Sequence, residues 1–93
     1  MYHAIQRDKT GLTFHDVLLL AHLYETNLQL GFYQLHKFLT GYYPQKLGNS
    51  KVYEAMKRLQ EKQFVNLSFT PKGFKRWTIS IAGINYLQKL SRK

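Results

Sequence analysis

The sequence has no cysteine, few acidic residues and no long hydrophobic run. Without cysteine there is neither a disulfide framework nor a thiolate metal site. The leucine run at residues 18–20 is far shorter than the ~20 apolar residues that cross a bilayer, and residues 1–5 lack the apolar core of a signal peptide. We therefore expect one soluble, cytoplasmic domain of 93 residues with no membrane contact.

Enzyme chemistry finds little support in the sequence. The five acidic residues are dispersed and mostly interleaved with bases at helical spacing, and there is no glycine-rich phosphate loop or nucleophile constellation. His15 and His22 are two helical turns apart, which is too far for the i, i+4 pair of a metal site. We expect no enzymatic activity, no cofactor and no metal.

Positive charge is concentrated in the second half of the chain. The net charge is +9, from 14 Lys and Arg against 5 Asp and Glu. Residues 1–45 hold three bases and three acids, whereas residues 46–93 hold eleven bases and two acids. Solubility alone would not require this segregation, so it indicates a polyanionic partner for one face.

Residues 48–64 predict an amphipathic helix. Val52, Met56 and Leu59 recur on one face, and Asn49 or Ser50 can cap the first turn. The rest of the helix surface mixes short polar, basic and aromatic groups, which suits a helix that reads base edges. These outer and flanking residues are Ser50, Lys51, Tyr53, Glu54, Lys57, Arg58 and Glu61.

Two strands joined by a tight turn are predicted after this helix. Apolar and polar residues alternate in residues 65–70 and again in residues 76–81, on either side of Pro-Lys-Gly at residues 71–73. A three-residue loop sets Leu67 opposite Trp77 and Val65 opposite Ile79, which keeps one face apolar. It also places Gly73 at the left-handed position of the common three-residue loop.

Three further helices are expected around this unit. The first starts at Thr13 with a capping-box-like Asp16 and runs to about residue 26. The second spans about residues 32–39, after a break at residues 27–31 where Gly31 suits a cap or turn. The last spans about residues 81–90 and is capped by Ser80. Residues 1–12 form an N-terminal arm, which is disordered, a short strand or helix, or a dimer contact, and residues 13–93 form the domain.

Helix, strand, basic turn and strand is the order of a winged helix-turn-helix, an α+β fold with three helices, a two-stranded hairpin wing and a short C-terminal helix. Residues 13–90 resemble the PadR-like and MarR-like winged-helix DNA-binding proteins. Residues 50–65 are similar to the PadR-type recognition helix, with Tyr53 where the family has Tyr, and residues 79–83 are similar to its Leu-Thr-Xaa-Xaa-Gly exit. Gln63 and Phe64 depart from the usual Gly-apolar pair, and the long C-terminal dimerisation helices are missing.

The residues expected to contact DNA fall into two groups. On the helix, Lys57 or Arg58 suits guanine, Glu54 suits a cytosine amine, and Tyr53 suits a phosphate, as the PadR resemblance implies. On the wing, basic residues suit phosphates or the minor groove. The full set is Asn49, Ser50, Lys51, Tyr53, Glu54, Lys57, Arg58, Lys72, Lys75 and Arg76.

The pattern as a whole favours a homodimeric transcriptional regulator that binds double-stranded DNA. Alternatives are a plasmid, phage or replication-origin DNA-binding protein of the same fold, or a winged-helix protein-interaction module. We expect the dimer to form through the arm and the first and last helices. Leu18, Leu19, Leu20 and Leu23 give the first helix more apolar surface than the domain can cover, and the last helix adds Ile84, Tyr86, Leu87 and Leu90.

Overall fold

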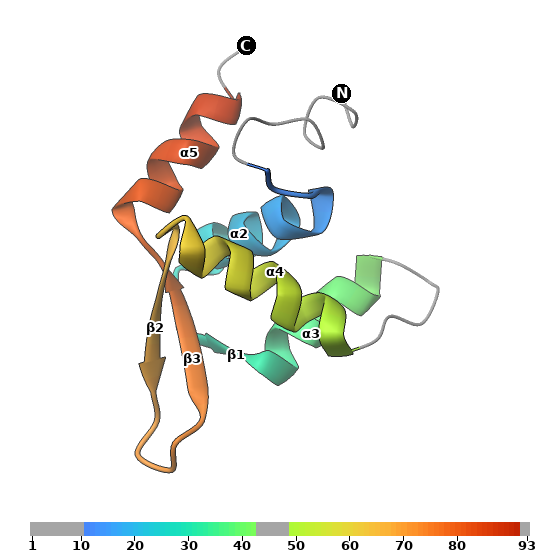
Figure 1. Ribbon diagram of the computed structural model, residues 1–93, viewed down its shortest axis with the longest axis vertical. Helices are drawn as coiled ribbons and strands as arrows, with labels where there is room; N and C mark the ends of the chain where they lie inside the picture. Colours follow the sequence, from blue (N-terminus) through green and yellow to red (C-terminus); the bar gives the residue numbers. More distant parts are fainter. Residues whose placement is uncertain (1–10, 43–48, 92–93) are drawn as a thin grey trace.

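The computed structural model describes residues 11–42 and 49–91, and these residues form a winged helix (Figure 1). The elements in chain order are α2 (Phe14–Thr26), β1 (Leu30–Gly31), α3 (Phe32–Tyr42), α4 (Asn49–Glu61), β2 (Val65–Phe69), β3 (Lys75–Ile79) and α5 (Ile81–Ser91). The predicted α+β winged-helix architecture is therefore confirmed. Within the described ranges, no helix combines the length and the apolar character that a membrane span requires.

The β2–β3 hairpin, hereafter the wing, has the predicted register. Leu67 pairs with Trp77 and Val65 with Ile79. Thr70 and Phe74 close the loop, because the Thr70 N–H donates to the Phe74 carbonyl at 2.8 Å, and Gly73 has a φ of +88°. Figure 1 shows the wing extending beyond the helices.

A third strand was not predicted. Leu30 and Gly31, expected to form a cap or turn, pair with Trp77 and Arg76 as the short strand β1, and the sheet order is β1-β3-β2. A strand of two residues has no alternation that a sequence pattern can reveal. β1 joins the start of α3 to the wing.

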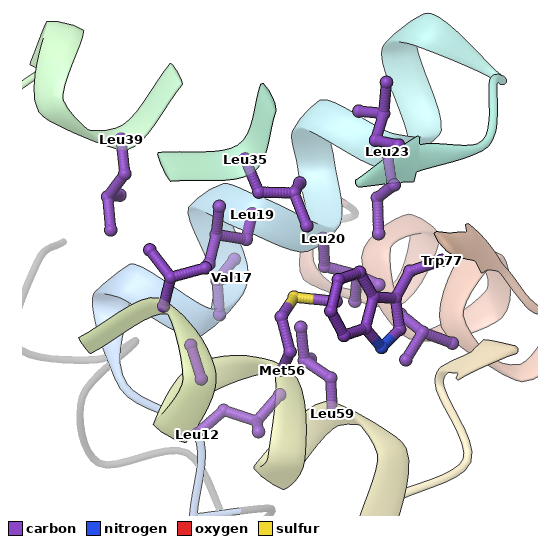
Figure 2. Close-up of a cluster of buried hydrophobic side chains, with 14 residues drawn as sticks. Leu12, Val17, Leu19, Leu20, Leu23, Leu35, Leu39, Met56, Leu59 and Trp77 are labelled. Carbon is purple, nitrogen blue, oxygen red and sulfur yellow. The ribbon is translucent and has the colours of Figure 1, made fainter. Parts of the chain in front are cut away.

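The core lies between the helices and one face of the sheet, with Trp77 among its most buried side chains (Figure 2). The Trp77 indole Nε1–H donates to the Gln60 Oε1 at 3.0 Å, which satisfies its one polar group. The other buried apolar residues are Leu12, Val17, Leu19, Leu20, Leu23, Leu30, Leu35, Leu39, Val52, Ala55, Met56, Leu59 and Val65. The division at residue 12 stays a prediction, although Leu12, assigned to the arm, belongs to this core.

The expected surplus of apolar surface on the first helix is not present. Leu19, Leu20 and Leu23 are fully buried within the domain, and Leu18 packs against the same core. The reason is that α2 contacts α3, α4, α5 and β3, so it is covered on several sides. Most of the predicted arm lies outside the described residues.

The helix ends follow from local hydrogen bonds. Thr13 and Asp16 form the predicted capping box, and Ser80 accepts from the Gly83 N–H at 3.1 Å as the predicted cap of α5. α3 continues to Tyr42, beyond the expected end near Leu39, and the Thr40 hydroxyl donates to the Lys37 carbonyl within the helix at 3.0 Å.

α4 ends with a residue in the left-handed conformation, which glycine usually adopts at this position. Gln63 has a φ of 62°, its N–H donates to the Gln60 carbonyl at 2.9 Å, and the Phe64 N–H donates to the Leu59 carbonyl at 3.0 Å. This is the Schellman pattern, with Gln63 at the left-handed position that glycine usually occupies. Gln63, which stands where the PadR-type pattern has glycine, therefore leaves the helix end intact.

Candidate nucleic-acid interface

The outer surface of α4 carries most of the side chains that the sequence predicted for it. Lys51, Tyr53, Glu54 and Lys57 are exposed, whereas Val52, Ala55, Met56 and Leu59 are buried against the core. Asn49 and Ser50 form the first residues of α4. Their side chains, and the predicted cap, lie outside the described part of the structure.

Arg58 has a protein partner instead of an open surface. Its Nε donates to the Asp16 Oδ2 at 2.6 Å and its Nη2 donates to the Asp16 Oδ1 at 2.8 Å. The side chain of Arg58 is 36% exposed and that of Asp16 is fully buried. The hydrogen bond to Asp16 raises the pKa of Arg58 above its ordinary value. Because this fork is occupied, we leave Arg58 out of the proposed base contacts.

Sequence reasoning missed this pair because it looked along one helix. Arg58 was expected to contact DNA from the surface of α4, whereas its partner Asp16 is 42 residues away on α2. Only the packing of α2 against α4 brings the two together.

Tyr53 combines a packed side with an exposed one. Its ring stacks on Phe32 with a centroid distance of 4.3 Å and an interplanar angle of 17°, yet the side chain remains exposed. The stack fixes Tyr53 of α4 against the start of α3. A tyrosine held in this way keeps its hydroxyl as a donor or acceptor for a partner.

The three basic residues of the wing differ in how far their side chains are exposed. Lys72 and Lys75 are exposed. Arg76 is half-buried: its Nη1 donates to the Lys75 carbonyl at 3.0 Å, and a Cβ added at Gly31 would stand 2.5 Å from that nitrogen. The absence of a side chain at Gly31 therefore lets the guanidinium lie across β1.

A groove of about 580 Å³ lies between the wing, the start of α3 and Tyr53. It brings together Tyr53, Lys75 and Arg76 from the predicted site, but not Lys51, Glu54, Lys57 or Lys72. Its remaining lining residues, none of which the sequence analysis assigned to a site, are Phe32, Tyr33, Gly73, Phe74 and Trp77. The sequence has seven Tyr and six Phe, and none of the buried core residues in the described ranges is a Tyr or Phe. This number of aromatic residues is the sequence signal that could have indicated an aromatic surface site.

Metal chemistry has no evident site in the described ranges. Among residues 11–42 and 49–91, no group of three His, Cys, Asp or Glu side chains is placed to hold an ion. His22 instead stacks on Phe38 with a centroid distance of 3.8 Å.

Comparison with known proteins identifies similar folds. No family model and no curated protein matches the chain. Among solved structures, it is similar to MepR, a transcription regulator of the Staphylococcus aureus efflux pump MepA, at 17% identity and a TM-score of 0.75, covering 94% of this chain and 62% of MepR. A probable transcriptional regulator from Pseudomonas aeruginosa gives 23% identity and a TM-score of 0.74, covering 97% of this chain and 66% of that one.

A PadR family transcription regulator from Clostridium difficile gives 18% identity and a TM-score of 0.69, covering 85% of this chain and 84% of that one. The chain spans less than two thirds of the length of MepR and of the Pseudomonas protein. All three neighbours are described as transcription regulators, the Pseudomonas protein as a probable one. The chain has the winged-helix fold that MarR-type and PadR-type transcription regulators share.

Proposed function

We propose that this chain is a cytoplasmic transcriptional regulator that binds double-stranded DNA sequence-specifically. The observation that carries the proposal is the location of the positive charge. The excess of +9 falls in residues 46–93, and Lys51, Lys57, Lys72 and Lys75 of that half are exposed on α4 and the wing. A winged helix presents these two elements together, so a polyanion would meet both.

The two elements have different roles in this proposal. α4 enters the major groove, where Lys57 suits guanine and Glu54 accepts from a cytosine amine, while Asn49, Ser50 and Lys51 meet a phosphate at the helix start. Tyr53 contacts a phosphate. On the wing, Lys72, Lys75 and Arg76 bind phosphates or the adjacent minor groove.

Salt dependence of duplex binding tests the proposal. Each phosphate that the protein neutralises contributes about −0.9 to the slope of log affinity against log salt. We expect Lys72→Ala to reduce that slope, because it removes one cation from the wing. Lys37→Ala is the matched control, since Lys37 is also exposed but lies on α3. A salt response that is flat for the unmodified protein would exclude DNA as the partner.

We further infer that the regulator is a homodimer formed through α2 and α5. A second groove, of about 210 Å³, lies between these helices and is lined by Ala21, Tyr24, Glu25, Leu87, Gln88 and Ser91. Tyr24 beside it and Ile81 at the start of α5 are exposed. A two-fold pair would place two recognition helices about 34 Å apart, in successive major grooves.

Sedimentation at micromolar concentration tests the dimer. We expect Tyr24→Arg to weaken association, whereas Leu28→Arg, an exposed position outside this groove, should not. Leu87 and Leu90 are unsuitable for this test because both pack against the core of their own domain. A clean 11.0 kDa species for the unmodified protein would rule the dimer out in the absence of DNA.

A further inference from the structure

The groove between the wing and α3 carries aromatic surface that duplex binding leaves unexplained. Tyr33 is 73% exposed and Phe74 is 61% exposed, and both line it. The outside of a duplex offers phosphates, sugars and base edges, which are read mainly by charged and hydrogen-bonding groups, and an apolar group there contacts the thymine methyl alone. Phe74 lacks a charged or hydrogen-bonding group, so a duplex offers its ring little beyond that methyl. The flat faces of bases, which an aromatic ring does bind, are stacked inside a duplex.

The chemistry of the groove is that of a site for an unpaired nucleotide. Aromatic side chains supply surfaces on which a base stacks, and a cationic rim supplies partners for its phosphate. Here Tyr33, Tyr53 and Phe74 supply the stacking surfaces, and Lys75 and Arg76 supply the cationic rim. None of the described residues that line the groove is acidic. Its volume of about 580 Å³ lies within the range of small-molecule sites.

Part of the groove wall is held in place before any ligand arrives. Phe32 stacks on Tyr53 at 4.3 Å, and the Trp77 indole is fixed by Gln60. The backbone of Phe74 is tied to Thr70 at both ends: its N–H donates to the Thr70 Oγ1 at 3.1 Å and its carbonyl accepts from the Thr70 N–H at 2.8 Å. Such walls lose little freedom when a base enters.

We propose that this groove binds an unstacked base of single-stranded DNA between Tyr33, Tyr53 and Phe74, with the attached phosphate on Lys75 and Arg76. The inference rests on the proposed function in that nucleic acid is the partner in both. A protein segment is a less suitable occupant, because only one that carried acidic side chains would supply partners for the two cations of the rim, whereas every nucleotide carries a phosphate.

The test compares a fluorescently labelled dT15 strand with a duplex of the same length by anisotropy. We expect Phe74→Leu and Tyr33→Leu each to lower dT15 affinity about tenfold, the loss typical of one stacked base. Duplex affinity should stay unchanged, because neither side chain belongs to the proposed duplex contacts.

The matched control is Phe69→Leu. Phe69 is also 61% exposed on the wing, but it does not line the groove, so this variant should bind dT15 like the unmodified protein. Far-UV circular dichroism checks that the variants keep their fold. Equal losses for Phe69→Leu and Phe74→Leu would overturn the inference.

The same data separate the two proposals. Duplex binding without dT15 binding overturns the base site and leaves the regulator proposal standing. Binding of dT15 without any duplex binding supports the base site and refutes the duplex proposal. Tighter binding of a U15 strand than of dT15 would identify RNA as the ligand and overturn the assignment to DNA.

Discussion

Asp16 of α2 holds Arg58 of α4 through both of its carboxylate oxygens, at 2.6 and 2.8 Å. The same carboxylate accepts from the Thr13 N–H at 3.1 Å, so one fully buried group both caps α2 and fixes α4. A buried charge is tolerated when it is paired and hydrogen-bonded in this way. The pair therefore orients the proposed recognition helix against the first helix.

Removal of Arg58 should be costly because it leaves Asp16 buried without its cation. We expect Arg58→Ala to lower the free energy of unfolding by about 3 kcal/mol. In an Asp16→Asn background the same change should cost much less, since no buried charge is stranded. Urea unfolding of the two single variants and the double variant gives the coupling energy. Additive losses would show that the two side chains act independently.

Substitutions on α4 and on the wing should affect DNA binding in different ways. Lys57→Ala on α4 should lower the preference for the best site, by about 1–3 kcal/mol if Lys57 contacts a guanine. Lys72→Ala on the wing should weaken binding to all sequences alike. Competition between a selected site and random duplex measures the difference. The reverse result, with specificity lost only in the wing variant, would exchange the two roles.

The start of α5 should tolerate no side chain at Gly83. A Cβ there would collide with the backbone carbonyl oxygen of Phe64, which already accepts from the Ser80 N–H. We expect Gly83→Ala to destabilise the fold by about 1–3 kcal/mol, the usual cost of overpacking. Gly41→Ala is the matched change, because Gly41 lies in α3 with open space around it, and should stabilise by about 0.5–1 kcal/mol. Thermal melts that shift alike for both would contradict this.

Gln63 should be replaceable by glycine with a gain in stability. A left-handed conformation costs an L-residue about 1–2 kcal/mol, and the entropy that glycine loses offsets about 0.5–1 kcal/mol of that gain. We expect Gln63→Gly to raise the free energy of unfolding by about 0.5–1 kcal/mol. Asn27→Gly should change it less, because asparagine tolerates its φ of 53°. A loss of stability on Gln63→Gly would refute the strain at the end of α4.

Acidification should destabilise the fold through His22. Burial against Phe38 and the core lowers the pKa of His22 below 6.5, and Glu25 partly opposes this. The folded state therefore favours neutral His22, and its contribution is complete above the ordinary pKa and is lost as pH falls through the lowered one. His22→Tyr, which does not titrate there, should lose less stability between about pH 7 and pH 5 than the unmodified protein. Equal changes in melting temperature would exclude His22 as a cause.

Local sequence signals were sufficient to predict the wing and the N-terminal caps of α2 and α5. The register of Leu67 on Trp77 follows from alternation and from Pro and Gly in the loop, and Thr13 with Asp16 is a signature four residues long. These features depend on neighbours in the chain. Sequence patterns could therefore predict them.

Features that depend on distant packing were not predictable. The two residues of β1 form a strand only because β3 lies beside them, and Arg58 lies next to Asp16 only after α2 and α4 have packed. The burial of Leu19 and Leu20 needs four partner elements around α2. The aromatic groove joins residues 32–33 to residues 73–77, and no local pattern links them.

The position of Trp77 in the chain bears on how the protein folds during synthesis. Trp77 lies in the core together with residues of α2, but it belongs to β3, late in the chain (Figure 2). A nascent chain that has not yet released residues 75–79 lacks this side chain and both partners of β1. Its α2 leucines then have no sheet to cover them. The domain should therefore fold only after residues 75–79 have left the ribosome.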